Sequence, residues 1–236
     1  MNWSVTILTL FPEMFPGPLG QSLAGKAGEQ GLWELKTLDI RDFSIDKHNT
    51  VDDKSFGGGT GLVMRADVLE RAVEAAKAGY KRPKMIYFSP RGKVFDQVKA
   101  EELVQSPENI MLCGRYEGVD ERVLEHYGFE EISLGDFILS GGEIAALAAI
   151  DACLRLIPGV IKTAQVHAEE SFSSAGNNAG LLEYPHYTRP AIWRGLPVPE
   201  VLLSGHHANV REWRLKQAER ITRERRPDLW AKYMKD

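Results

Sequence analysis

Cysteine is scarce in this sequence of 236 residues, which contains only Cys113 and Cys153. Both lie among apolar residues, and two isolated thiols make no disulfide framework, so a reducing compartment is favoured. Long apolar runs are missing too, because the segment IAALAAI (144–150) is far too short to cross a bilayer. The N-terminal stretch has neither the basic region nor the small-residue cleavage pattern of a signal peptide. We therefore expect a cytoplasmic protein that does not engage a membrane.

Several cofactor and metal signatures are also absent. The sequence has no GxxxxGK[ST] pattern, which argues against a P-loop nucleotide site. Its six histidines include no HExxH pair and no pair flanked by cysteines, so we predict no metal-binding residues. The glycine-rich FGGGTG (56–61) follows a polar loop and precedes LVM instead of a helix, which makes it a poor dinucleotide fingerprint.

The net charge of −4 is unevenly distributed along the chain. Residues 201–236 contain nine Lys and Arg against five Asp and Glu, so the negative excess lies in the first 200 residues. A basic C-terminal segment beside an acidic body suggests an anionic partner, and nucleic acid is the obvious candidate. A solvated amphipathic helix explains the charges equally well, and charge alone does not separate the two interpretations.

Stretches with strand and helix character alternate over the first 160 residues. The expected strands, some with their following turns, lie at 3–11, 32–40, 84–92, 109–118 and 130–143. The expected helices lie at 18–31, 65–79, 95–105, 119–127 and 143–159. Such alternation predicts an α/β domain with a mostly parallel sheet.

Two regions depart from this alternation. Residues 41–61 are polar and without periodicity, and a loop of that length inside a compact domain is usually functional or mobile. From about Ile161 the sequence becomes rich in Ser, Asn, Gly and Ala, and its last segment is helical and basic. We predict an α/β domain at 1–160, a linker at 161–185 and a small basic helical domain at 186–236.

Three of the expected strands end in turns with distinctive residues, at 87–92, 112–118 and 133–142. Ligands of open α/β sheets bind outside the carboxyl ends of the strands, and glycine lets the main chain approach them closely. These turns are therefore expected to share one crevice. One of them, LCGRYEGVDER (112–122), is by itself compatible with a nucleotide-binding turn, a catalytic loop with Glu117 at its tip, or a plain strand-to-helix corner.

Seven motifs occur in a defined order: TVDDKSFGGGTGLVM, YFSPRG, LCGRYEGVDERV, SLGDFILSGGE, RLIPGV, PHYTRP and VLLSGHHANVREWRLKQ. In these motifs and their order the chain resembles bacterial tRNA (guanine-N1)-methyltransferases over essentially its whole length. The resemblance implies the fold of the knotted (SPOUT) methyltransferases, with a deep trefoil knot in the C-terminal part of the α/β domain and a small helical domain after it. Periodicity alone gives no hint of a knot, because chains almost never thread their own loops.

The resemblance implies that the three turns hold S-adenosylmethionine. Adenine needs an apolar slot with main-chain donors and acceptors at its edge, which a glycine turn beside Leu134 and Leu139 supplies, although core packing explains any one apolar residue. The family's cofactor positions fall here on Tyr87, Ser89, Pro90, Gly114, Leu134, Gly135, Asp136, Phe137, Ile138, Leu139, Gly141 and Gly142. Magnesium is a second cofactor that the resemblance implies, although no aspartate cluster marks a metal cage made of protein groups.

The implied reaction moves a methyl group to N1 of the guanosine just 3′ of a tRNA anticodon, position 37. Neutral guanine carries a proton on N1, so the attack needs a base and a partner for the charge that grows on O6. The family's arginine falls on Arg155, which a helix C-terminus would also favour for its charge alone. Glu170 stands where the family commonly has an aspartate before Ser-Phe and is the expected base, with Glu169 as substitute. Glu117 is expected to hold the target guanine.

Contact with tRNA is implied for the glycine loop, the linker and the basic C-terminal helix. The expected RNA-binding residues are Gly59, Ser171, Arg211, Arg214, Lys216 and Arg220. The family completes its active site across a homodimer, so a second copy of the chain is an expected partner. Two alternatives stay open: a knotted methyltransferase that modifies another base or a ribose hydroxyl, and an α/β module that binds RNA without chemistry.

Overall fold

The computed structural model describes residues 2–161, 169–173 and 180–235. The chain divides into two compact units, Met1–Lys162 and Thr163–Asp236. The first unit contains the main sheet with its covering helices, and the second contains a short hairpin and the C-terminal helices.

The main sheet has five strands in the order β2-β1-β6-β5-β7, and every pair in it is parallel. Its strands are β1 (Trp3–Thr9), β2 (Trp33–Asp39), β5 (Lys84–Val94), β6 (Glu108–Leu112) and β7 (Glu130–Ser133). All but one residue in each of β1 and β6 is buried, as expected for parallel strands that are covered on both faces. The predicted α/β class with a parallel sheet is confirmed.

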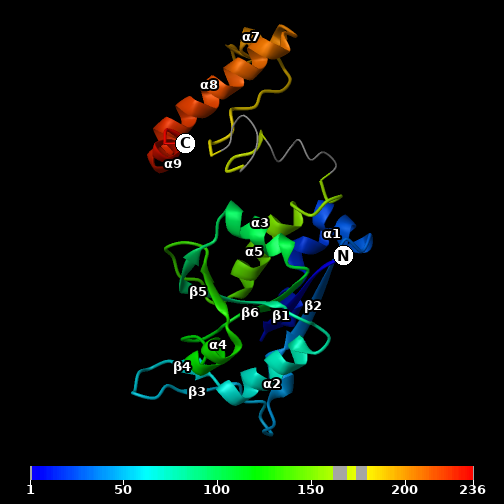
Figure 1. The fold of residues 1–236 in the computed structure, drawn as a ribbon, viewed down its shortest axis with the longest axis vertical. Coiled ribbons are helices and arrows are strands. Elements are labelled where there is room, and N and C mark those ends of the chain that lie inside the picture. The colour runs from blue at the N-terminus through cyan, green and yellow to red at the C-terminus, as the bar shows by residue number, and fades with distance from the viewer. Residues whose placement is uncertain (1, 162–168, 174–179, 236) are drawn as a thin grey trace. The chain divides into compact units, whose positions relative to one another are not determined.

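Helices cover both faces of this sheet (Figure 1). One face carries α1 (Ser22–Glu29), α3 (Gln97–Gln105) and α5 (Glu143–Leu154), and the other carries α2 (Ala66–Lys77) and α4 (Glu121–Tyr127). Short 3-10 segments are η1 (Pro12–Met14), η2 (Gly17–Gly20) and η3 (Ile40–Phe43). The helix α5 is buried around most of its circumference, which its near-continuous apolar sequence permits. The helix α4 is short because Asp120 caps its start and Gly128, at φ 66°, ends it.

The polar stretch 41–61 is more ordered than its lack of periodicity predicts. It contains β3 (Asp52–Lys54), which pairs antiparallel with β4 (Leu62–Met64). Before β3 the chain turns around Asp46, where hydrogen bonds from the backbone N–H groups of Thr50 and His48 lower the pKa of this carboxyl to about 2. Sequence reasoning missed β3 because all three of its residues are charged, and Asp and Lys are depleted in strands.

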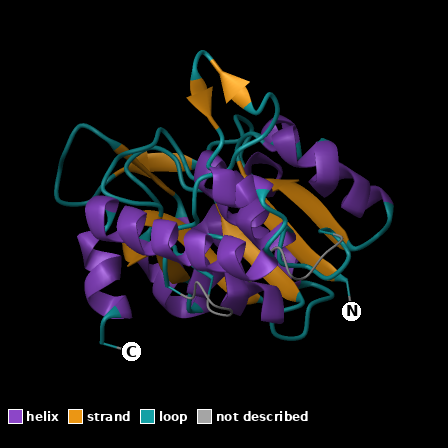
Figure 2. Ribbon diagram, turned by 90° about the horizontal axis from the view of Figure 1, so that it is seen from above, coloured by secondary structure: helices purple, strands orange, loops and turns teal. Residues whose placement is uncertain are grey.

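The second unit contains a hairpin of β8 (Ile192–Trp193) and β9 (Leu196–Pro197) that the sequence did not reveal (Figure 2). The expected C-terminal helices follow as α7 (Glu200–Leu203), α8 (His207–Arg225) and α9 (Pro227–Tyr233). Part of the predicted linker packs on α8, since Leu181 is fully buried and the Leu182 N–H donates to Thr222 Oγ1 at 2.8 Å. Among the described residues, no helix is long and apolar enough to cross a membrane.

Candidate active site

The predicted turns at 112–118 and 133–142 meet beyond the carboxyl ends of β6 and β7, where together with residues 87–90 of β5 they line a cavity of about 290 Å³. The expectation of a turn at 87–92 is wrong, because these residues lie inside β5, whose pairing with β7 shifts register between Phe88 and Lys93. We call this cavity the ligand crevice. Eleven of the twelve predicted cofactor residues line it: Tyr87, Ser89, Pro90, Gly114, Leu134, Gly135, Phe137, Ile138, Leu139, Gly141 and Gly142. Asp136 lies in the same loop but is not part of the lining. The crevice that the sequence predicted is thus present in the fold.

Glycines allow the loops of the ligand crevice to approach one another. The Gly142 N–H donates to the Gly114 carbonyl at 3.1 Å, which joins loop 134–142 to loop 113–118. A Cβ on Gly142 would lie 2.8 Å from Cys113 Cα, and one on Gly114 would lie 2.8 Å from the Tyr87 ring. Because backbone and a buried ring cannot give way cheaply, these positions require glycine.

The crevice combines a buried interior with an apolar rim. Burial and the nearby Glu131 carboxylate raise the pKa of Tyr87, so its hydroxyl stays protonated at neutral pH. At the rim, Ile138 is 80% exposed and Phe137 is 53% exposed. Ile144, in the first turn of α5, is also exposed. Neighbouring exposed apolar side chains of this size mark a surface that binds a ligand or another chain.

Two charged residues beside the crevice escaped sequence reasoning. Glu143, the first residue of α5, is 1% exposed, and its Oε2 lies 2.9 Å from Nη2 of Arg115. Their signal in the sequence was weak, because Arg115 falls inside a turn and Glu143 reads as an ordinary acidic residue at a helix start.

Glu117 lies against the glycine loop that precedes β4. Its N–H donates to the Leu62 carbonyl at 3.0 Å, and its side chain is packed on Gly61, where any side chain would collide with it. The predicted RNA-contact residue Gly59 belongs to the same loop, at φ 121°. The fold therefore brings together Glu117, the glycine loop and the edge of the ligand crevice.

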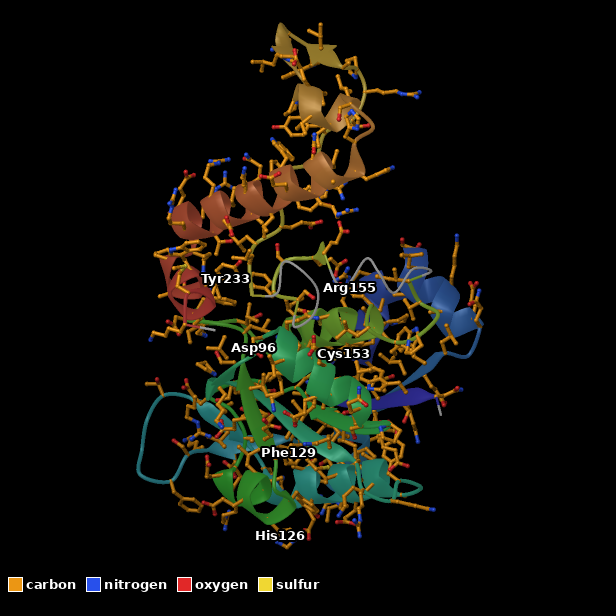
Figure 3. The ribbon with its side chains drawn as sticks, turned by 45° about the horizontal axis from the view of Figure 1, so that its top comes forward. Asp96, His126, Phe129, Cys153, Arg155 and Tyr233 are labelled. Atoms are coloured by element: carbon orange, nitrogen blue, oxygen red, sulfur yellow. The ribbon has the colours of Figure 1, made fainter. Side chains whose placement is uncertain are left out.

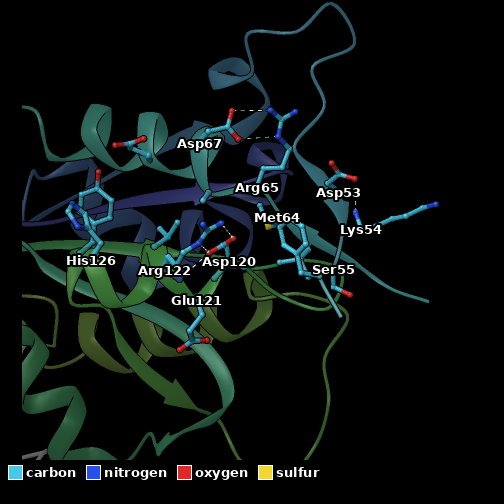
Figure 4. Close-up of a pocket in the computed structure, with 17 residues that line it drawn as sticks. Asp53, Lys54, Ser55, Met64, Arg65, Asp67, Asp120, Glu121, Arg122 and His126 are labelled. Atoms are coloured by element: carbon cyan, nitrogen blue, oxygen red, sulfur yellow. Dashed lines mark hydrogen bonds and ion pairs between the residues drawn. The ribbon is translucent and has the colours of Figure 1, made fainter. Parts of the chain in front are cut away.

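A larger cavity of about 1190 Å³ lies between the β3–β4 hairpin, α2 and α4 (Figure 4). Ion pairs of Arg65 with Asp67 and of Arg122 with Asp120 line it, at 3.0 and 2.7 Å. Although several carboxylates face this cavity, no group of three or more His, Cys, Asp or Glu in the described part of the chain is placed to hold a metal ion. Its charges are largely paired within the protein, so we assign it no ligand.

Arg155 lies at the opposite end of α5 from the ligand crevice. It is the C-cap of this helix and lies near Cys153 (Figure 3), whereas Glu143 beside the crevice is its first residue. Twelve helical residues span about 18 Å at ~1.5 Å each. One copy of the chain therefore does not bring Arg155 to the crevice that its own α5 borders.

In the second unit, the segment that holds Glu170 is tied to α8. The Glu169 carboxylate accepts hydrogen bonds from the Tyr184 hydroxyl at 2.6 Å and from Arg214 at 3.3 Å. The Arg214 guanidinium also stacks on the Tyr184 ring at 4.6 Å. Burial and the bond to Glu169 raise the pKa of Tyr184 to about 12. The predicted RNA-contact residue Ser171 accepts a hydrogen bond from the N–H of Glu183 at 2.9 Å.

The predicted RNA-binding cations of α8 fall into two groups. Lys216 pairs with Glu212 at 2.6 Å, Arg220 pairs with Glu224 at 2.9 Å, and Arg214 is committed to Glu169. Arg211 makes no ion pair with a described residue, and the same holds for Arg223 and Arg225 further along the helix. Those three are the better-placed cations for an external anion.

A parallel α/β sheet with a glycine-rich crevice at its strand ends belongs to the class of open α/β proteins that bind ligands at that edge. Residues 3–232 match the model of the tRNA (Guanine-1)-methyltransferase TrmD family. The tRNA (guanine-N(1)-)-methyltransferase of Rhodopseudomonas palustris is 56% identical over 98% of this chain and 91% of its own length. That of Rhodospirillum rubrum is 55% identical over 99% and 95%, and that of a Ruegeria species is 57% identical over 98% and 93%. The chain belongs to the tRNA (guanine-N1)-methyltransferase family and is an enzyme of that class.

Proposed function

We propose that this protein transfers the methyl group of S-adenosylmethionine to N1 of the guanosine just 3′ of a tRNA anticodon, position 37. The observation that carries the proposal is the coincidence of a family match over residues 3–232 with a crevice lined by the expected cofactor residues. Neither a ribose methyltransferase nor a module without chemistry would be expected to match this family over the whole chain.

The ligand crevice suits S-adenosylmethionine chemically. Leu134, Ile138 and Leu139 offer apolar surface for an adenine ring, while Gly114 and Gly142 let the loops that line the crevice pack closely together. Once bound, S-adenosylmethionine supplies a methyl group on a positively charged sulfur, which keeps the electron pair of the broken C–S bond.

The protein's own residues handle the proton and the charge of the guanine. Glu117 holds the guanine by accepting from its 2-amino group, and Arg155 donates to O6, where negative charge develops. The carboxylate of Glu170 takes the N1 proton as N1 bonds to the methyl carbon, which leaves a neutral methylated base and a protonated Glu170. The neighbouring Glu169 carboxylate accepts from the Tyr184 hydroxyl and from Arg214.

We further propose that the crossing of the strand-end loops is a trefoil knot. Loop 134–142, which leads into α5, is joined to loop 113–118 by the Gly142–Gly114 hydrogen bond and by the Arg115–Glu143 ion pair. A segment that passes through another loop would make close contacts of this kind with that loop.

We also propose that the active enzyme is a homodimer whose site takes residues from both copies. The support is the length of α5, which separates Arg155 from the crevice of its own chain by about 18 Å. The apolar rim with Phe137, Ile138 and Ile144 offers a surface that a second copy would cover.

The test of the proposed function is methyl transfer from labelled S-adenosylmethionine to a transcribed tRNA that carries guanosine at position 37. We expect label on N1 of that guanine, and none in a tRNA that carries adenosine there. Label on a ribose or on another base, or no label with any tRNA, would overturn the proposal.

A further inference from the structure

A largely buried ion pair borders the ligand crevice, whose lining includes Arg115. Arg115 Nε donates to Glu143 Oε1 at 3.2 Å, and Arg115 Nη2 lies 2.9 Å from Glu143 Oε2 as an ion pair without hydrogen-bond geometry. The Glu143 side chain is 1% exposed and that of Arg115 is 19% exposed. A charged pair with little exposure and one direct hydrogen bond holds the two groups close together.

The end of β1 is hydrogen-bonded to the Arg115–Glu143 ion pair. The Thr9 hydroxyl, which is fully buried, donates to Glu143 Oε1 at 2.8 Å and accepts from the Phe11 N–H at 3.0 Å. The Phe11 ring stacks on the Arg115 guanidinium at 4.4 Å. The Arg115 guanidinium is thereby held both by a carboxylate and by a ring.

Arg115 reaches across from one crevice loop to the other. Its Nη1 donates to the Ser140 carbonyl at 3.2 Å, in the loop opposite its own. Its side chain passes so close to Gly141 that a Cβ there would collide with both Arg115 and Glu143. The only other direct tie that joins these loops in the described hydrogen-bond pattern is the Gly142–Gly114 bond.

We propose that Arg115 and Glu143 are positioning residues for S-adenosylmethionine, because their ion pair sets the spacing of loops 113–118 and 134–142, between which the crevice lies. This inference rests on the proposed function, since it assigns the crevice to that cofactor. This control of the loop spacing does not require either side chain to contact the cofactor. A shift of about 1 Å between groups that hold a reactant is enough to lower a rate by ~10²-fold.

The test measures S-adenosylmethionine affinity by titration calorimetry and steady-state kinetics for Glu143→Gln and Arg115→Lys. Glu143→Gln removes the negative charge at nearly constant size, and Arg115→Lys keeps the positive charge but removes the planar guanidinium that reaches Glu143 and the Ser140 carbonyl together. We expect the Kd and KM for S-adenosylmethionine to rise about tenfold or more, while the KM for tRNA stays unchanged. Glu102→Gln, which breaks the exposed Lys84–Glu102 pair, serves as matched control and should change neither constant.

A double variant, Arg115→Met with Glu143→Leu, separates positioning from stability. Apolar replacement of a buried ion pair is often neutral for stability, so its melting temperature should approach that of the unchanged protein. Its S-adenosylmethionine affinity should stay low, because no group then holds the Ser140 carbonyl. Unchanged S-adenosylmethionine affinity in the double variant, or in both single variants, would overturn the inference. If the single variants unfold, the affinity of the double variant alone tests it. Absence of binding to the unchanged protein would instead refute the proposed function.

Discussion

At the scale of single residues, the proposed mechanism assigns proton removal and binding of the guanine to different carboxylates. Glu117 is fixed in a turn against Gly61, whereas Glu170 lies in a segment tied to α8 through its neighbour Glu169. In the proposed mechanism this separation suits the chemistry, because Glu117 accepts from the 2-amino group of the guanine and leaves the N1 proton to Glu170.

Glu170→Gln should lower turnover by about 10²- to 10⁴-fold, since an amide cannot accept the N1 proton. Binding of S-adenosylmethionine should stay unchanged, and calorimetry together with single-turnover assays measures the two quantities. Glu169→Gln is the matched control, because it weakens the contact with Arg214 but leaves an acceptor for Tyr184, and it should cost far less. Turnover retained in Glu170→Gln, or an equal loss in Glu169→Gln, would contradict the assignment.

At the scale of elements, α8 presents its cations unequally. Each arginine that neutralises a phosphate contributes about 0.7 to 0.9 to the slope of log affinity against log salt. Changing Arg211, Arg223 and Arg225 to Gln should therefore reduce the slope for tRNA by about two units or more. Changing the paired Lys216 and Arg220 to Gln should reduce the slope less per residue changed, because Glu212 and Glu224 already offset their charges. Equal reductions per residue changed, measured by filter binding at several salt concentrations, would contradict this division.

The helix α3 is tied to the sheet by lysine–glutamate pairs that respond to acid. Hydrogen bonds from Lys99 and Lys84 lower the pKa of Glu102 to about 2. A carboxyl group whose pKa is lower in the folded state than in the unfolded state stabilises the fold at pH values above its unfolded-state pKa of ~4.3. This stabilisation is lost as the pH falls towards 2. The pair is 44% exposed on both sides, so we expect less than ~1 kcal/mol. Glu102→Gln should lower the unfolding free energy at pH 7, and this difference should shrink between about pH 4 and pH 2 in urea titrations. A difference independent of pH would contradict the role of this carboxylate.

At the scale of the whole molecule, the proposed dimer predicts complementation between two inactive variants. Glu170→Gln keeps an intact crevice, and Gly142→Val keeps an intact base but forces the crevice loops apart. In a mixed dimer, one site combines both intact parts if crevice and base come from different chains. An equal mixture should thus regain about a quarter of the unchanged activity, by the statistics of random pairing. No gain after subunit exchange, with mixed dimers verified by native mass spectrometry, would contradict a shared site.

The sequence was most informative where local chemistry decides the structure. The buried strands and the glycine turns were predictable because apolar runs and glycine act within a few residues. The strand β3 was hidden by three charged residues that pair through their backbone. The Arg115–Glu143 pair joins residues 28 positions apart, and the Glu169–Arg214 pair joins residues 45 positions apart. No local sequence pattern predicts such contacts, because they arise from the topology of the fold.

The position of Arg155 has a consequence for how the chain can evolve. In the proposed dimer each α5 starts at one active site and ends at the other, so the length of this helix sets the distance between them. Deleting one residue from α5 would shorten the helix by ~1.5 Å and turn Arg155 by about 100° around the helix axis. In such a dimer, apolar residues inside α5 can replace one another during evolution, but an insertion or deletion in this helix would disturb both active sites.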